Sequence, residues 1–326
     1  MRSLRDLDVA PELRGAIATI GNYDGLHRGQ RAVLERVVSE ARAAGAPAMV
    51  ISFDPHPLAV LEPGRAPRRL TTDLQRERLL EAWGIDALLK LRFDRELASL
   101  PGERFVREIL ADRLALRGLL VGSRFRFGRG RDGDLALLER LGAELGFSVH
   151  GVGEIEIGGA AVSATRIRGL LERGEVRGAS ELLGRPYAVL GEVVHGAGRG
   201  AELGFPTVNL DSDNEILPRY GVYVVEIALE GENGAHPGVA NVGVRPTVGR
   251  DQPPVVEAHL LDFDRSCYGL RAEVRFLHRL RSERRFPSFG ALRAQIAADV
   301  RFAREYFRRP GGSPPVEASD GSTSGP

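Results

Sequence analysis

The sequence predicts two folded parts, an α/β domain with a parallel sheet and a smaller antiparallel β domain that ends in a helix. Up to Leu183, short apolar runs alternate with amphipathic stretches, and such alternation produces a parallel sheet covered by helices on both faces. From Tyr187 on, short strand-like segments broken by glycine and proline replace the helical spacing, which is typical of a small antiparallel barrel or sandwich. A chain of 326 residues is long enough to bury a core in each part.

In the first part, four short apolar runs are predicted as buried strands. These strands are 16–20, 48–53, 87–91 and 119–121. The stretch 28–44 is predicted as a helix because its apolar side chains fall on one face at helical spacing. Further helices are predicted at 72–83, 96–110, 134–145, 165–173 and 176–183. Because open parallel sheets bind ligands at the carboxyl ends of their strands, we expect a site at that edge.

In the second part, the segments between turn-forming residues are predicted as strands. They are 187–194, 222–229, 239–242, 255–261 and 270–276. The last of them alternates between apolar and charged residues, which indicates one buried and one solvated face. A final helix is predicted from 288 to 307, and a tail rich in proline, glycine and serine at 310–326 is expected to be disordered. We therefore predict domains at 1–184 and 185–309.

Charge and composition exclude several classes of protein. The net charge is +1, so there is no basic field for nucleic acid, although the abundance of arginine makes a nucleic-acid binder an alternative worth weighing. No run of about 18 apolar residues is present, so no membrane partner is expected. The chain starts without the apolar core of a signal peptide, and Cys267 is its only cysteine. These features predict a cytoplasmic protein, and a weak homo-oligomer is compatible with them.

The single lysine excludes one way of binding ATP. Lys90 follows a leucine, so the chain contains no Gly-Lys-Ser/Thr phosphate loop. Phosphate groups would therefore be bound by arginine, histidine, backbone amides or a metal ion.

The segment 195–209 is predicted to bind a metal–nucleotide complex. It reads His-Gly-Ala-Gly-Arg-Gly-Ala-Glu-Leu-Gly-Phe-Pro-Thr-Val-Asn, and its glycines let backbone N–H groups approach a phosphate. Thr207 and Asn209 stand two positions apart, so their side chains face the same side of an extended segment. Their oxygens suit Mg²⁺, with Mn²⁺ as the alternative. A glycine-rich hairpin turn is the simpler interpretation, and the Phe-Pro-Thr-Val-Asn ending favours the nucleotide loop.

Polar clusters follow several predicted strands of the first part. The segment 19–30 joins a strand to a helix N-terminus, an anion site at which His27 could contact a phosphate. Three further clusters, 53–57, 121–128 and 163–168, are placed at the same edge or at a helix start. Each has a structural interpretation by itself, but together they predict a ligand-binding edge.

These motifs resemble, in the same order along the chain, those of the prokaryotic bifunctional riboflavin kinase/FMN adenylyltransferase family, also called FAD synthetase. The resemblance extends to about Phe307. Its motifs in the first part are Gly21-Asn-Tyr-Asp-Gly-Leu-His27, Phe53-Asp-Pro-His-Pro57, Phe125-Arg-Phe-Gly128, Thr165-Arg-Ile-Arg168 and Leu183-Gly-Arg-Pro-Tyr187. Its motifs in the second part are Leu203-Gly-Phe-Pro-Thr-Val-Asn209, Tyr220-Gly-Val-Tyr223, Asn241-Val-Gly-Val-Arg-Pro-Thr247, Val256-Glu-Ala-His-Leu-Leu-Asp-Phe263 and Tyr268-Gly269.

For the second part, the resemblance implies a six-stranded barrel that phosphorylates riboflavin with MgATP. Thr207 and Asn209 match metal and phosphate residues of the family, and Glu257 matches the general base for the ribityl hydroxyl. The implied ATP-binding residues are Gly198, Gly200, Gly204, Pro206, Thr207 and Asn209, and the implied flavin-binding residues are Asn241 and Arg245.

For the first part, the resemblance implies a Rossmann-like nucleotidylyltransferase domain that transfers AMP from ATP to FMN, giving FAD and pyrophosphate. His27 and Arg168 are the implied catalytic residues. The implied ATP-binding residues are Gly21, Asn22, Asp24, Gly25, His27, Gln30, Thr165 and Arg168, and the implied flavin-binding residues are Phe53, Pro55, His56, Phe125 and Phe127.

Three residues of the first part depart from the family pattern. Gln30 replaces the second histidine of the His-x-Gly-His loop, Arg124 stands where an acidic or amide residue is usual, and Ala164 replaces a serine. A charge-assisted hydrogen bond is worth roughly 1.5–3 kcal/mol, so its loss at Gln30 would slow adenylylation by about one to two powers of ten. The alternative function is therefore riboflavin kinase alone with an impaired adenylylation domain. Adenylylation of another phosphate-bearing acceptor is less consistent with an adjoining flavin kinase.

Overall fold

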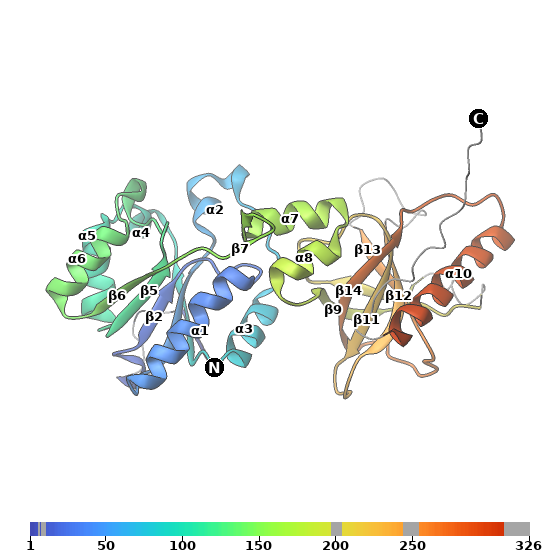
Figure 1. The fold of residues 1–326 in the computed structure, drawn as a ribbon, viewed down its shortest axis with the longest axis horizontal. Coiled ribbons are helices and arrows are strands. Elements are labelled where there is room, and N and C mark those ends of the chain that lie inside the picture. Colours follow the sequence, from blue (N-terminus) through green and yellow to red (C-terminus); the bar gives the residue numbers. More distant parts are fainter. Residues whose placement is uncertain (6, 8–10, 197–203, 244–253, 310–326) are drawn as a thin grey trace. The chain divides into compact units, whose positions relative to one another are not determined.

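A computed structural model describes residues 1–5, 7, 11–196, 204–243 and 254–309. The chain divides into two compact units, here called the α/β unit and the barrel unit (Figure 1). The α/β unit comprises Met1–Ile167 and Leu182–Gly184, and the barrel unit comprises Arg168–Glu181 and the chain from Arg185 on. The sequence predicted one boundary, between residues 184 and 185. In the structure, the segment 168–181 also belongs to the barrel unit, where the backbone N–H of Arg219 donates to the carbonyl of Leu171.

The α/β unit contains a six-stranded sheet in the order β1-β4-β3-β2-β5-β6, with every pair parallel. Its strands are β1 (Arg2–Leu4), β2 (Ile17–Ile20), β3 (Ala48–Asp54), β4 (Ala87–Arg92), β5 (Gly118–Gly122) and β6 (Ser148–Val152). The four strands expected from apolar runs are confirmed. The other two form the edges of the sheet, where side chains are only partly covered, so no apolar run marks them.

Helices cover both faces of this sheet (Figure 1). They are α1 (Arg28–Ala43), α2 (Pro57–Leu61), α3 (Asp73–Ala82), α4 (Arg95–Ser99), α5 (Gly102–Arg104), the π-helix Phe105–Arg113 and α6 (Leu135–Leu145), with 3₁₀ turns at Pro11–Leu13, Pro63–Arg65 and Arg129–Arg131. The single helix expected at 96–110 is wrong. The chain breaks at Pro101, which lacks an N–H to continue the first helix, and it resumes in a wider helix.

Two apolar clusters place α1 and α3 on one face of the sheet and the π-helix and α6 on the other. Leu34 and Leu80 belong to the first cluster, whereas Leu110 and Leu138 belong to the second. The ends of β2, β3 and β5 are left for the loops that carry the predicted site. A short hairpin of β7 (Glu156–Ile157) and β8 (Ala160–Ala161) follows β6, and its two turn glycines both have positive φ.

The barrel unit is a closed antiparallel barrel in the order β10-β13-β12-β11-β14-β9. Its strands are β9 (Tyr187–Val194), β10 (Val208–Ser212), β11 (Gly221–Leu229), β12 (His236–Gly243), β13 (Val255–Leu260) and β14 (Arg271–Arg281). The structure decides between barrel and sandwich, because β9 pairs with both β10 and β14 and closes the sheet. The five strands expected from the sequence are confirmed, and β10 was missed because it is short and has only two apolar residues, Val208 and Leu210.

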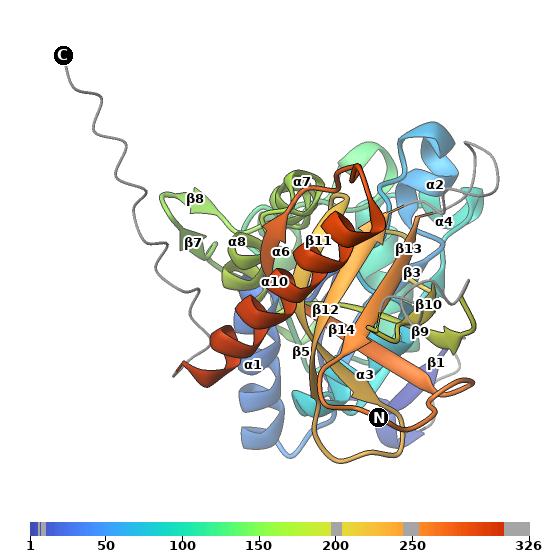
Figure 2. The same cartoon turned by 90° about the vertical axis from the view of Figure 1, so that its right-hand side faces the viewer.

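Helices α7 (Ala164–Arg173), α8 (Val176–Leu183) and α10 (Phe289–Arg308) complete the described chain. Helix α10 lies against the outer face of the barrel, over β11 and β12 (Figure 2). Its Asp299 forms a doubly hydrogen-bonded ion pair with Arg281 at the end of β14, at 2.7 and 3.0 Å. Tyr223 and Phe276 meet edge to face inside the barrel. No helix among the described residues is long and apolar enough to cross a membrane.

Candidate functional site

The barrel brings three predicted site residues into one row across neighbouring strands. In the antiparallel register, Asn209 on β10 lies opposite Glu257 on β13, and Glu257 lies opposite Asn241 on β12. Directly opposed residues share one face of a sheet. The hydroxyl of Thr207, just before β10, donates a hydrogen bond to Oε1 of Glu257 at 2.5 Å. Thr207 and Asn209 therefore face the same side, as the sequence predicted.

This row lies on the outer face of the barrel. Along β13, Val256, Ala258 and Leu260 are buried, whereas Glu257 and His259 are half-buried on the other face. Glu257 is thus a carboxylate held by a sheet but reachable by a ligand. The apolar residues on either side of Glu257 in the sequence predicted this partial burial.

Asn209 lies close under the backbone of Gly196. It is 5% exposed, and a Cβ on Gly196 would lie 1.9 Å from its Nδ2. A glycine is therefore required at 196 for the start of the glycine-rich loop to pass over the Asn209 amide. The predicted positions Gly198, Gly200 and Arg245 lie outside the described residues. Gly204, whose φ is +85°, and the exposed Pro206 precede Thr207.

Two residues near this row were not anticipated from the sequence. His259 Nδ1 lies 2.8 Å from the carbonyl oxygen of Pro206, and the Asn241 amide donates to Oε1 of Glu283 at 3.0 Å. A Cβ on Gly243 would lie 2.0 Å from that Glu283 oxygen. The Glu283 carboxylate therefore occupies the space that a side chain at residue 243 would need. His259 was detectable because it alternates in step with Glu257. Glu283 follows β14 in an irregular segment, and no sequence signal marks its approach.

In the α/β unit, the loop after β2 is shaped by three left-handed residues. Tyr23, Gly25 and Leu26 all have positive φ. The Tyr23 hydroxyl lies 2.5 Å from Oγ1 of Thr19, and burial raises the pKa of this phenol well above its usual value. The Asp24 carboxylate accepts from the backbone N–H groups of Leu70 and Thr71, so it fixes the loop to the start of α3. Of the predicted ATP-binding residues, Asp24 therefore has a clear structural task.

His27 and Gln30 form a reciprocal cap at the N-terminus of α1. Nδ1 of His27 accepts from the backbone N–H of Gln30 at 3.3 Å, and Oε1 of Gln30 accepts from the backbone N–H of His27 at 3.1 Å. Because Nδ1 accepts, the proton of the neutral ring lies on Nε2, which is the atom able to donate to a phosphate. The Gln30 backbone N–H thus holds the His27 ring, and the Gln30 side-chain oxygen caps the backbone N–H of His27, a contact that the sequence did not predict.

His56 and Asn22 meet at the carboxyl edge of the sheet. Nε2 of His56, just after β3, lies 2.8 Å from the amide of Asn22, which follows β2. Nδ1 of His56 caps α2 by accepting from the backbone N–H of Leu58 at 3.1 Å. The nearby Phe53 contacts Phe93 edge to face. The structure therefore brings together predicted ATP-binding and flavin-binding residues from two loops, with Pro55 between Phe53 and His56.

The two predicted flavin-binding phenylalanines after β5 differ in accessibility. Phe125 and Phe127 stack at 5.6 Å, but Phe127 is 7% exposed and packs in the core against Phe105 and Gly133. Phe125 is half-buried at the margin of the same cluster. Of the two rings, Phe125 offers the surface on which a flat ligand could lie.

The two other departures from the family pattern have local explanations. Arg124 forms a doubly hydrogen-bonded ion pair with Glu154, an acidic partner supplied by the loop after β6. At Ala164 the helix cap is retained by its neighbour, since the Ser163 hydroxyl accepts from the backbone N–H of Arg166 at 3.3 Å. Of the predicted residues on α7, Thr165 is exposed in the α/β unit and Arg168 belongs to the barrel unit.

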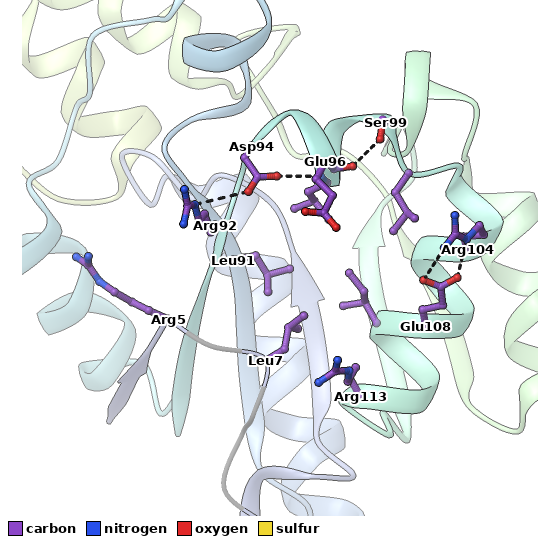
Figure 3. A pocket seen from close by; sticks show the side chains of 13 residues that line it. Arg5, Leu7, Leu91, Arg92, Asp94, Glu96, Ser99, Arg104, Glu108 and Arg113 are labelled. Atoms are coloured by element: carbon purple, nitrogen blue, oxygen red, sulfur yellow. Dashed lines mark hydrogen bonds and ion pairs between the residues drawn. The ribbon is translucent and has the colours of Figure 1, made fainter.

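A separate cavity of about 490 Å³ lies at the end of β4, between the segment after β1 and the helices that follow β4 (Figure 3). It is lined by charged side chains, among them Arg92, Asp94 and Arg104, and these arginines pair with neighbouring carboxylates. None of the predicted site residues lines it.

The donor atoms of the barrel row suit a metal that arrives with a nucleotide. The described residues contain no group of three or more His, Cys, Asp or Glu side chains that could hold a metal by themselves. A hydroxyl, an amide and a carboxylate are hard oxygen donors, and Mg²⁺ is usually bound by one or two such groups together with phosphates and water. Thr207 and Asn209 are therefore too few to hold a resident metal ion by themselves, and their oxygens suit a metal that arrives bound to phosphates.

Comparisons with known proteins cover both units. Residues 9–166 match the family model described as FAD synthetase, and residues 183–307 match the model described as riboflavin kinase. A bifunctional riboflavin kinase/FMN adenylyltransferase of Escherichia coli (strain K12) is 41% identical over 309 residues, which cover 94% of this chain and 97% of that protein. Proteins of the same name from Pseudomonas fluorescens and Haemophilus influenzae are 41% and 35% identical, over 93% and 90% of this chain and 97% and 95% of theirs.

Among solved structures, a crystal structure described as that of a macrolide-efflux protein from Streptococcus pneumoniae is similar with a TM-score of 0.84 and 27% identity. The similarity covers 94% of this chain and 100% of that one.

Proposed function

Because the chain belongs to the family of bifunctional riboflavin kinase/FMN adenylyltransferases, we propose that it phosphorylates riboflavin to FMN and then transfers AMP from ATP to FMN. The products of the second step are FAD and pyrophosphate. The observation that carries the proposal is the row of Thr207, Asn209 and Glu257, in which one hydroxyl, one amide and one carboxylate meet on the outer face of the barrel. The substrates in this proposal are ATP, riboflavin and FMN, and ATP binds as its Mg²⁺ complex. The proposed location of the enzyme is the cytoplasm.

In the kinase reaction, Glu257 accepts the proton of the terminal ribityl hydroxyl as that oxygen attacks the γ-phosphorus of MgATP. The bond from the γ-phosphorus to the bridging oxygen breaks, and MgADP leaves. Phosphoryl transfer depends mainly on positioning, charge neutralisation and a proton acceptor. Thr207 and Asn209 supply oxygen atoms toward the metal and phosphates of ATP. Asn241 lies opposite Glu257 in the register, and it is the residue of this row that we propose to contact the flavin.

In the adenylylation reaction, an oxygen of the FMN phosphate attacks the α-phosphorus of ATP, and pyrophosphate leaves. Nε2 of His27 donates to the phosphates at the N-terminus of α1, where backbone N–H groups and the helix dipole favour negative charge. Phe53, His56 and Phe125 line the flavin side. No covalent enzyme intermediate is required, because catalysis comes from alignment and charge stabilisation.

The departure at Gln30 bears on the rate of this second step. The Gln30 side chain caps the backbone N–H of His27, and its backbone N–H holds the ring. The loop therefore keeps its capped geometry although its second histidine is missing. What Gln30 cannot supply is a positive charge. We propose an active adenylyltransferase in which this charge is absent. The kinase-only alternative has no structural observation in its favour.

The test is chromatographic separation of flavins after incubating the purified chain with riboflavin and MgATP. We expect FMN first and FAD later. FMN that accumulates without FAD would support the kinase-only alternative, and riboflavin that remains unchanged would contradict the proposal as a whole.

A further inference from the structure

His259 connects the strand that carries Glu257 to the segment that carries Thr207. It stands two residues after Glu257 on β13, so both side chains leave the same face of the strand. Its Nδ1 lies 2.8 Å from the Pro206 carbonyl oxygen, and its ring meets Phe205 edge to face at 5.6 Å. Two successive outward side chains of β13 thus hold the short segment 205–207.

The backbone ladder does not hold this segment. Pairing of β10 with β13 begins at Val208, opposite Ala258, and residues 205–207 have no regular secondary structure. Proline lacks an N–H for a ladder bond. The hydrogen bond from His259 to Pro206 therefore replaces a strand contact just where the chain approaches Thr207.

The chemistry of this contact specifies which atom acts. A carbonyl oxygen only accepts, so Nδ1 of His259 must carry a proton. The neutral Nδ1–H tautomer and the protonated ring both meet this condition. The contact therefore positions the chain and involves no proton transfer.

We propose that His259 is a positioning residue of the riboflavin kinase site, which sets the Thr207 hydroxyl against Glu257 by holding Phe205 and Pro206. This inference rests on the proposed kinase function. Without the His259 contact, the Thr207 oxygen would be free to leave the position from which it meets Glu257 at 2.5 Å. The affinity for MgATP and the rate of phosphoryl transfer would both fall, although the reacting groups would be unchanged.

Three substitutions test this proposal, because they differ in where they place an N–H group. Asn reproduces the reach of Nδ1, Gln reproduces the reach of Nε2, and Leu removes the donor. We expect His259→Asn to keep FMN formation within about threefold of the parent. We expect His259→Gln and His259→Leu to lower kcat/KM for MgATP by about tenfold or more, since one hydrogen bond to a required position is lost. Thermal unfolding of the same preparations controls for folding of the barrel unit, and conversion of FMN to FAD controls for the amount of active α/β unit.

The pH profile of FMN formation by His259→Asn provides the second readout. We expect the parent profile, because Asn positions but does not titrate. Parent-like activity in all three variants, equal impairment of Asn and Gln, or a changed profile would each overturn the positioning role. A parallel Glu257→Gln variant distinguishes a failure of the proposed kinase site from a failure of the role proposed for His259. If it still forms FMN at the parent rate, the proposed kinase site is wrong; if it is inactive while the His259 series shows no ranking, only the role of His259 is wrong.

Discussion

The two predicted sites are built in different ways. In the barrel unit, Asn209, Glu257 and Asn241 are placed by strand register, and each is fixed by the ladder on both sides. In the α/β unit, His27 and His56 stand at helix N-termini after strands, and side-chain caps hold them. In a site built by strand register, a small shift of the backbone displaces the functional side chains. Such a site needs few other side chains to hold them in place. A site on loops depends on supporting partners such as Gln30 and Asp24.

The largest expected effect comes from the reacting carboxylate of the barrel. Glu257→Gln keeps an oxygen to accept from Thr207 but removes the proton acceptor, so FMN formation should fall by roughly two to four powers of ten. Conversion of FMN to FAD should stay at the parent rate. Glu192→Gln, on an exposed outward position of β9, is the matched control and should leave both steps unchanged. Activity of each step is measured separately, starting from riboflavin or from FMN.

A methyl group at residue 196 tests how closely backbone and side chain approach in the register-built site. A Cβ there would lie 1.9 Å from Nδ2 of Asn209, so Gly196→Ala must displace either the loop or the amide. We expect FMN formation to fall by about tenfold or more, since small misplacements of phosphoryl-transfer groups are costly. Gly290→Ala, where a Cβ would meet only Ser288 Oγ at 3.8 Å, is the control. Equal kinetics for the two variants would refute the close-approach argument.

The loop-built site is tested at Gln30. Gln30→Ala removes the acceptor for the His27 backbone N–H, and we expect FAD formation to fall several-fold and unfolding free energy to drop by about 0.5–2 kcal/mol. Gln30→His adds a chargeable donor at the same place, and we expect more FAD per unit time than in the parent. FMN formation from riboflavin is the internal control for both. A Gln30→His variant that makes no more FAD would refute the interpretation of this residue as a missing charge.

The smallest expected effect on catalysis concerns the attachment of α10 to the barrel. Asp299, 6% exposed, is paired with Arg281, whereas Asp262 forms an exposed pair with Arg304. Breaking a buried pair from one side costs roughly 3–5 kcal/mol, whereas an exposed pair contributes about 0–1 kcal/mol. Asp299→Asn should therefore lower the stability of the barrel far more than Asp262→Asn, with kinase activity retained by the folded fraction. Thermal unfolding measures the difference, and similar midpoints would contradict it.

Sequence reasoning failed where tertiary contacts determine the outcome. The edge strands β1 and β6 carry no long apolar run, and the helix expected at 96–110 is divided at Pro101. The partners of Arg124 and Asn241 are Glu154 and Glu283, which lie 30 and 42 positions away along the chain. No local pattern indicates such pairings, because they depend on how loops pass over a finished sheet.

The sequence by itself determined the two-part fold class and the strands with apolar runs, and it predicted the residues of both sites, because periodicity and motif order are local properties. Only the tertiary structure decided that the second part closes into a barrel, that Asn209, Glu257 and Asn241 share one row, and that Gln30 supports His27 through its oxygen. It also showed His259 holding Pro206. These outcomes depend on register and on contacts between distant segments, and such contacts exist only after the chain has folded.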